Sequence, residues 1–177
     1  MGGVVRSKNL RIAGDKFNND IITYIRNQFK ILIGEKTAEN VKHTIGSVIS
    51  GPVPLETTIK GRDLITGLPR EVIVTDTDIR EALYPSIETL VESTREVLEL
   101  TPPEILSDIM QRGIYLAGGG ALITGLAELI QNEVNIPVHV TADPLTAVAR
   151  GTGIILENIE LYKDILIENE DALPPKK

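Results

Sequence analysis

Short apolar runs alternate with helical patterns through the second half of the chain, and this order limits the possible folds most strongly. The runs "IYLA" (114–117) and "IPVHV" (136–140) are typical of short buried strands. Helical spacing follows each of them, over residues 122–133 and 143–159, and Gly151 and Gly153 are expected to interrupt the second helix. Because strands that alternate with helices form parallel pairs, the sequence predicts an α/β sheet.

The first part of the chain is expected to place helices before a β-hairpin. Residues 2–14 are predicted as a strand or a hairpin, and Asp15 as the N-cap of a helix. The apolar positions of that helix recur with helical spacing and are Phe17, Ile21, Ile22, Ile25 and Phe29. Thr37 is the predicted N-cap of a second helix, whose buried stripe is Ala38, Val41 and Ile45.

A β-hairpin and a long helix are predicted between residues 55 and 100. Two β-rich runs, 55–60 and 71–75, flank a turn region that contains Gly61, Gly67 and Pro69. The long helix is expected from about residue 76, and its buried face is formed by Ile79, Leu83, Ile87, Leu90, Val91, Thr94 and Leu98. Pro85 should bend or break this helix, because proline has no N–H to donate.

Composition excludes several classes of protein. The 177 residues are 42% apolar, which suffices for a buried core. A net charge of −7 without any basic run argues against a nucleic-acid partner. The absence of cysteine excludes disulfides and thiolate zinc sites, and two isolated histidines do not make a metal cluster. No apolar run approaches the ~20 residues of a membrane-spanning helix, and no signal peptide is evident, so a cytoplasmic location is expected.

Three consecutive glycines, Gly118 to Gly120, follow the apolar run 114–117. A glycine turn between a strand and a helix can hold an anion or admit a flat ligand against bare backbone. The pattern is neither a P-loop, since no Gly-Lys-Ser/Thr follows, nor the G-x-G-x-x-G of dinucleotide sites. A tight turn without a ligand therefore remains an alternative reading of these residues.

Five segments, taken in order and at their spacing, resemble the C-terminal half of the MreB family of bacterial actins. They are RIAGDKFNNDIITYI, IGEKTAENVKHTIG, GRDLITGLPREV, TPPEILSDIMQRGIYLAGGGALITGL and DPLTAVARGTG. The resemblance covers residues 2 to about 167. It implies half of an actin-like ATPase fold, of the ribonuclease H-like α/β class, with an incomplete sheet. Residues 1–33 and 101–177 would form part of the core subdomain, and 34–100 an inserted small α+β subdomain.

The resemblance implies that ATP is the cofactor and that this chain faces its adenosine moiety. The backbone of the glycine turn would lie under the adenine and ribose, and its residues are Gly118, Gly119, Gly120, Ala121 and Leu122. A second wall would come from the helix that contains Glu39, Asn40, Val41 and Lys42. The Glu39 carboxylate would accept hydrogen bonds from the ribose, while the Lys42 stem packs on the purine and its ammonium stays solvated. From the residues alone, Glu39 and Lys42 also fit an ordinary exposed pair on one helical face.

The phosphate-binding part of such a site is not found in this sequence. The family's two phosphate loops of the Asp-x-Gly type do not occur, and neither does the acidic residue that orients the attacking water. Phosphoryl transfer depends on stabilising charge around the γ-phosphate. We therefore predict no catalytic residue and no metal ligand, weak ATP binding and no hydrolysis by this chain alone. Mg²⁺ is expected only with the half of the family's sequence that is missing here.

The resemblance also implies partners. A full-length member would form head-to-tail filaments with itself, which requires a heterologous interface. This chain would contact the N-terminal half, and the whole protein would associate with the membrane and the cell-wall synthesis machinery that govern rod shape. The hairpin around Gly61 and Gly67 is one candidate contact, although an idle surface turn fits equally well. The small residues of 147–153 would allow close helix packing near the interdomain hinge. A nucleotide-independent interaction module with an actin-like fold is the alternative function.

Overall fold

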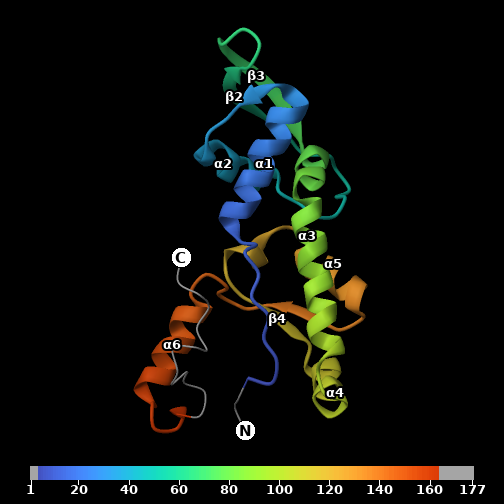
Figure 1. Cartoon of the computed structure of the whole chain (residues 1–177), viewed down its shortest axis with the longest axis vertical. Coiled ribbons are helices and arrows are strands. Elements are labelled where there is room, and N and C mark those ends of the chain that lie inside the picture. Colours follow the sequence, from blue (N-terminus) through green and yellow to red (C-terminus); the bar gives the residue numbers. More distant parts are fainter. Residues whose placement is uncertain (1–3, 164–177) are drawn as a thin grey trace.

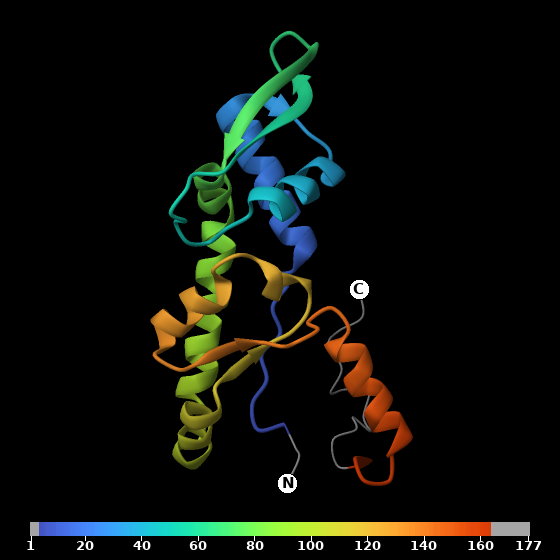
Figure 2. The ribbon, with the colours of Figure 1, turned by 180° about the vertical axis from the view of Figure 1, so that it is seen from behind.

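The computed structural model describes residues 4–163, which form an elongated molecule with α3 along its length (Figure 1). The helices are α1 (Gly14–Phe29), α2 (Glu35–Ile45), α3 (Asp76–Glu99), α4 (Pro103–Arg112), α5 (Leu126–Val134) and α6 (Ala147–Glu157). The strands are β1 (Ile31–Leu32), β2 (Glu56–Asp63), β3 (Pro69–Thr75), β4 (Ile114–Leu116) and β5 (Val138–Val140), and a 3₁₀ turn, η1 (Gly119–Leu122), follows β4. We call α1, α2 and β1–β3 the hairpin region, and β4, β5, η1 and α4–α6 the parallel region; they occupy opposite ends of α3 (Figure 2).

The hairpin region contains an antiparallel sheet in the order β1–β2–β3. β2 and β3 pair from Glu56 opposite Thr75 to Arg62 opposite Pro69, which confirms the predicted hairpin and lengthens its first strand. β1 adds to the other edge of β2, with Ile31 opposite Asp63. Antiparallel strands joined by a short turn pair locally, so the residue pattern was sufficient to predict them.

The core lies between α1, α2, α3 and the hairpin and continues into the parallel region through α5. The largest fully buried side chains are Ile21, Ile25, Ile31, Val74, Ile79, Leu83 and Ile130. They include residues of the stripes predicted for α1 and α3, and the predicted stripe of α2 is buried as well. Apolar residues at helical spacing thus face the core, as their period indicates.

Two helices begin earlier than predicted. α1 begins at Gly14, so Asp15 lies in its first turn, and Ala13 stands at the N-cap without a side-chain hydrogen bond. α2 begins at Glu35 after Gly34, so Thr37 lies inside the helix. Acidic residues in the first turn interact favourably with the positive end of the helix dipole even when they do not occupy the N-cap. The sequence therefore located these helices but not their first residues.

α3 runs without interruption from Asp76 to Glu99 through Pro85, so of the predicted bend or break the break is wrong. A capping box between Thr75 and Asp78 fixes its start. Next to the proline, the buried hydroxyl of Ser86 donates a hydrogen bond to Asp20 on α1. Packing against α1 on this face maintains the helix through the position where Pro85 donates no backbone hydrogen bond.

β4 and β5 pair in parallel, with Ile114 opposite Val138, which confirms the parallel arrangement predicted from the alternating pattern. The helix predicted over 122–133 is divided into η1 and α5 by Gly125, whose φ is 82°. A Cβ atom at Gly125 would come within 2.3 Å of Cγ1 of Ile49. Only glycine allows this close approach of the parallel region to the segment after α2.

The two regions also meet through the backbone. The N–H of Val48 donates to the carbonyl of Thr124 at 3.0 Å, and Ser47 forms an isolated parallel bridge with Thr124. The hydroxyl of Ser47 donates to the carbonyl of Ile49 at 2.7 Å, which stabilises the turn after α2. The end of α2 is therefore tied to the segment that follows the glycine turn.

Two further predictions are not met in the described residues. Residues 4–13 form no strand, which corrects the strand or hairpin predicted there, because a strand requires a paired neighbour. α6 runs without interruption through Gly151 and Gly153 and contains no buried residue. A Cβ atom at either glycine would meet no atom within 4 Å, so within residues 4–163 these two glycines have no close packing neighbour. Close helix packing of 147–153 at an interdomain hinge stays a prediction. The helices within residues 4–163 are also too short or too polar to cross a bilayer.

Candidate functional site

The three glycines connect β4 to η1 through a turn that requires glycine at its first position. Gly118 has a φ of 85°, which side chains rarely adopt, and its N–H donates to the carbonyl of Pro144 at 2.7 Å. A Cβ atom at Gly118 would meet nothing within 4 Å, so one face of the turn is open. Gly119 is exposed and Gly120 is half-buried, and a Cβ atom added at either would make only an ordinary van der Waals contact.

The residues of η1 lie on different sides of the turn. Ala121 is buried and its N–H donates to the Gly118 carbonyl at 3.1 Å, whereas the Leu122 side chain is 56% exposed. The N–H of Ile123 closes the turn on the Gly120 carbonyl at 3.2 Å. The predicted wall is therefore a compact turn whose accessible parts are its backbone and Leu122.

α2 presents the other predicted residues in two directions. Glu39 and Asn40 are exposed, whereas the side chain of Val41 is 2% exposed and belongs to the core. Lys42 is half-buried and reaches across to α1. Of this group, Glu39, Asn40 and Lys42 are the side chains that a ligand could reach.

The first turn of α1 lies next to both predicted segments. Lys42 Nζ donates to Oδ1 of Asn18 at 2.8 Å and approaches the Gly14 carbonyl at 3.4 Å. From the other direction, a Cβ atom at Gly120 would lie 3.9 Å from Cε2 of Phe17. The loop that carries η1 lies just below this end of α1 (Figure 1). Two segments that are about 80 residues apart in sequence are thus brought to one end of the same helix.

The Lys42 ammonium makes a contact that the sequence did not predict. It is held by Asn18, a buried side chain of α1, and among residues 4–163 it forms no ion pair with Glu39. This contact also does not match an ordinary exposed Glu–Lys pair on one helical face. Asn18 was missed at the sequence level, although a signal was present. It shares the buried helical stripe with Ile21 and Ile25, and a polar residue at such a position needs a partner.

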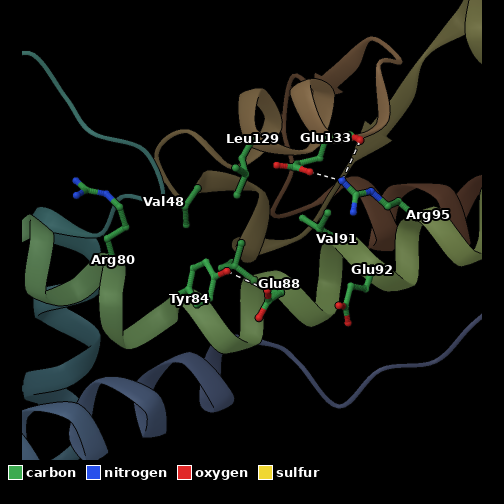
Figure 3. A pocket seen from close by; sticks show the side chains of 10 residues that line it. Val48, Arg80, Tyr84, Glu88, Val91, Glu92, Arg95, Leu129 and Glu133 are labelled. Atoms are coloured by element: carbon green, nitrogen blue, oxygen red, sulfur yellow. Dashed lines mark hydrogen bonds and ion pairs between the residues drawn. The ribbon is translucent and has the colours of Figure 1, made fainter.

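A groove of about 370 Å³ lies elsewhere, between α3 and α5 (Figure 3). Its apolar floor is formed by Val48, Ile87, Val91 and Leu129. At its rim Arg95 pairs with Glu133, and the Tyr84 hydroxyl donates to Glu88 at 2.9 Å. Arg80 is bound to Asp76, which lies outside the groove. Most of the charges that line the groove are therefore paired.

The largest pKa shifts also lie outside the predicted site. Burial raises the pKa of the Tyr24 hydroxyl, and its hydrogen bond to Glu81 adds to that rise. In the turn between β2 and β3, the N–H groups of Thr66 and Ile65 and the Arg70 guanidinium lower the pKa of Asp63 to about 2. Tyr24 thus connects α1 to α3, and Asp63 accepts hydrogen bonds within the β2–β3 turn. Across residues 4–163, no group of three potential ligands is placed to hold a metal ion.

Comparison with known proteins agrees with the resemblance. Residues 1–164 match the family model described as MreB/Mbl protein. The chain is 42% identical over 160 residues to the cell shape-determining protein Mbl of Bacillus subtilis (strain 168), which covers 90% of this chain and 48% of Mbl. It is 44% identical over 170 residues to the cell shape-determining protein MreB of Escherichia coli (strain K12), with 96% and 49% covered.

Solved structures agree in fold. MreB5 of Spiroplasma citri bound to ADP matches with a TM-score of 0.86 and 37% identity, over 92% of this chain and 50% of MreB5. The MamK double helical filament matches with a TM-score of 0.71 at 22% identity, over 84% of this chain and 45% of MamK, and shows likeness of fold alone. The chain thus spans about half the length of the relatives that it matches.

The predicted fold class is confirmed by these neighbours and by the arrangement of the elements. Small sheets that do not close, with helices beside them, are consistent with one half of an α/β actin-like fold. A family model that matches nearly the whole chain identifies the sequence independently of the structure. The chain therefore belongs to the MreB/Mbl family of actin-like proteins.

Proposed function

We propose that this chain forms the adenosine side of an ATP site in an actin-like protein that assembles into filaments and determines cell shape. One observation carries the proposal: the glycine turn and α2 meet at the first turn of α1, in a fold that matches nucleotide-bound MreB5. MreB5 was solved with both ADP and AMPPNP. The relatives' names, cell shape-determining proteins, support the wider role.

The accessible groups fit a nucleoside. The open face at Gly118 and the exposed Gly119 allow a planar base to approach the backbone without a Cβ atom in its way. Glu39 is exposed on α2, and a carboxylate can accept hydrogen bonds from two ribose hydroxyls. ATP would supply a hydrolysable γ-phosphate, but this chain's residues would bind and orient only the nucleoside. Mg²⁺ and the phosphate contacts belong to the part of the family's sequence that is not present here.

A titration with a fluorescent ATP analogue tests this role. Glu39→Ala and Lys42→Ala should each weaken binding by about tenfold, because each removes a contact to the nucleoside. His43→Ala is the matched control, since His43 is an exposed neighbour on α2 and should leave affinity unchanged. If the unaltered chain does not bind the analogue, or if the His43 variant loses as much affinity as the other two, the nucleotide role is wrong.

The same proposal includes a division into subdomains, with 1–33 and 101–177 as core and 34–100 as an inserted unit. In the structure β1, which this division leaves in the core, pairs with β2 of the insertion. Residues 164–177 lie outside the described residues. We further propose that the 177-residue polypeptide does not hydrolyse ATP, because its sequence has no phosphate loop and no catalytic acid. Phosphate release above the buffer rate would contradict this directly.

For filament assembly, we propose the tip of the β2–β3 hairpin as a contact between copies. Leu64, Ile65 and Leu68 are 45%, 82% and 65% exposed there, although the backbone around them is held by Asp63. Exposed apolar side chains on a rigid turn suit a docking surface, because binding orders a rigid turn at a lower entropic cost than a mobile one. For the full-length protein only, we propose contacts with an N-terminal half, with the membrane and with the cell-wall synthesis machinery.

Sedimentation of the chain at increasing concentration tests the contact. Ile65→Asp should reduce self-association, whereas Ile73→Asp, the same change at an exposed position of β3, should not. Equal sedimentation of both variants and the unaltered chain would mean that the tip is an idle turn. The alternative function, an interaction module that does not use nucleotide, predicts self-association that ATP leaves unchanged. The exposed apolar residues of α6 are the observation that favours it.

A further inference from the structure

The Lys42 ammonium is bound to the protein in a way that the proposed ATP site does not require. Its Nζ donates to Asn18 Oδ1 at 2.8 Å and lies 3.4 Å from the Gly14 carbonyl oxygen. A Cβ atom at Gly14 would be 3.6 Å from the same Nζ. The two acceptors are one turn apart on α1, so the first turn of this helix forms a seat for the ammonium.

Asn18 is a polar residue at a buried position of α1, and its side-chain oxygen is bound by Lys42. Its side chain is 3% exposed and shares the buried stripe of α1 with Ile21 and Ile25. A buried amide oxygen without a donor destabilises a protein, and within residues 4–163 Lys42 is the donor that it has. A hydrogen bond from an ammonium is stronger than one between neutral groups, so the contact restricts the lysine as well as satisfying the asparagine.

We infer that Asn18 is a positioning residue of the proposed adenosine site: with the Gly14 carbonyl, it holds the Lys42 ammonium on α1, so that α2 offers a ligand the uncharged Lys42 stem. The inference rests on the proposed function and adds to it a selectivity. Because the ammonium is hydrogen-bonded to α1, it points toward the protein. The methylene groups of the stem and the exposed Glu39 carboxylate are then the parts that can contact the ligand. Recognition through α2 then depends on the nucleoside, and the phosphates gain nothing from Lys42.

The test is an NMR titration of the ¹⁵N-labelled chain with ATP and, separately, with adenosine. Asn18→Leu keeps the branching at Cγ and removes the acceptor, and Asn18→Ala is a second variant should the larger leucine not be accommodated. Either should weaken both ligands by the same factor, about three- to tenfold. Asn18→Asp, which restores an acceptor for the ammonium, should bind within about twofold of the unaltered chain. Asn19→Ala is the matched control, an exposed neighbour on α1.

Two further measurements separate positioning from a structural role. Asn18→Leu combined with Lys42→Met should bind no more weakly than Lys42→Met alone, because Asn18 acts through Lys42. The ¹⁵Nζ signal of Lys42 should be protected from water exchange in the ligand-free chain and lose that protection in Asn18→Leu.

The outcomes distinguish the two proposals. If the unaltered chain binds neither ligand, the proposed function fails and this inference fails with it. If it binds both, but folded Asn18→Leu and Asn18→Ala bind as tightly, only the inference is wrong. The inference is also wrong if the losses of the Asn18 and Lys42 variants multiply, or if the Asn18 variants weaken ATP alone.

Discussion

The hairpin region and the parallel region differ in how completely they bury their own strands. In the hairpin region, Ile31 and Val74 are fully buried within a three-stranded antiparallel sheet. In the parallel region, the pair β4–β5 leaves Tyr115 65% and Val140 41% exposed. Parallel sheets are normally covered on both faces, whereas an antiparallel sheet can leave one face open. The sheet of the hairpin region is therefore better covered than that of the parallel region, although the apolar tip of the hairpin is exposed.

The helices differ in the same direction, with one exception. α1, α2 and α3 each bury an apolar stripe, whereas α4 and α6 contain no buried residue. In the parallel region only α5, among the described α-helices, buries residues, Leu126 and Ile130. On and before α6, Leu145, Val148 and Leu156 are each more than 60% exposed. The candidate site lies where the two regions meet, at the first turn of α1. We expect a rigid wall from the hairpin region and a less constrained one from the glycine turn.

Truncation of one core leucine on α3 and of one leucine on α6 tests this difference in packing most strongly. Leu83→Ala removes a fully buried side chain between α1 and α3 and should lower the free energy of unfolding by about 3 kcal/mol. Leu156→Ala, on α6 with 65% of the leucine exposed, should change it by no more than about 0.5 kcal/mol. Urea denaturation followed by circular dichroism measures both. Similar losses would show that α6 is as well packed as α3.

A pair of glycines compares the junction between the two regions with the exposed helix α6. Gly125→Ala forces a side chain into a φ of 82° and onto Ile49, so stability should fall by about 2 kcal/mol. Gly151→Ala, inside α6 with nothing within 4 Å of its added Cβ, should raise stability by about 0.5 kcal/mol through helix propensity. Thermal unfolding of the two variants gives the sign of each change. A loss of stability in Gly151→Ala would show that this position packs against another part of the protein.

Acid should weaken the hairpin region through Asp63. The folded state holds the pKa of this carboxyl at about 2, against an ordinary 3.8, because it accepts from the Thr66 and Ile65 N–H groups and from Arg70. Its contribution is present above about pH 4 and is lost as the pH falls through about 2. Between about pH 4 and about pH 2, the melting temperature of Asp63→Asn should therefore fall less than that of the unaltered chain. Thr66→Ala keeps the backbone donors and should retain most of the slope; an unchanged slope in Asp63→Asn would refute the assignment.

The smallest effect is expected at the rim of the groove between α3 and α5. Arg95 and Glu133 form an ion pair there, but their side chains are 47% and 42% exposed (Figure 3). Such pairs contribute about 0.5 kcal/mol, and salt screens them. A double-mutant cycle with Arg95→Met and Glu133→Gln, at low and high salt, should give a coupling of that size that declines with salt. A coupling of several times that value would mean that this contact holds the regions together.

Much of the fold could be predicted because its signals are local. The stripes of α1, α2 and α3, the β2–β3 hairpin and the β4–β5 strands followed from residue periodicity, and the family followed from five segments in order. Helix starts were predicted less well, as Asp15 and Thr37 show, because several residues near a helix start favour it similarly. The strand predicted over 2–14 failed because pairing depends on a partner as well as on the residues themselves.

Of the candidate site, the sequence by itself determined which segments to consider: the glycine turn and the α2 residues Glu39 and Lys42. Only the tertiary structure decided that both meet the first turn of α1, that Lys42 binds Asn18, and that α3 continues through Pro85. The reason is physical. Periodicity and turn residues act over a few neighbours in the chain, whereas these contacts join residues that are 24 or more positions apart and depend on how whole helices pack.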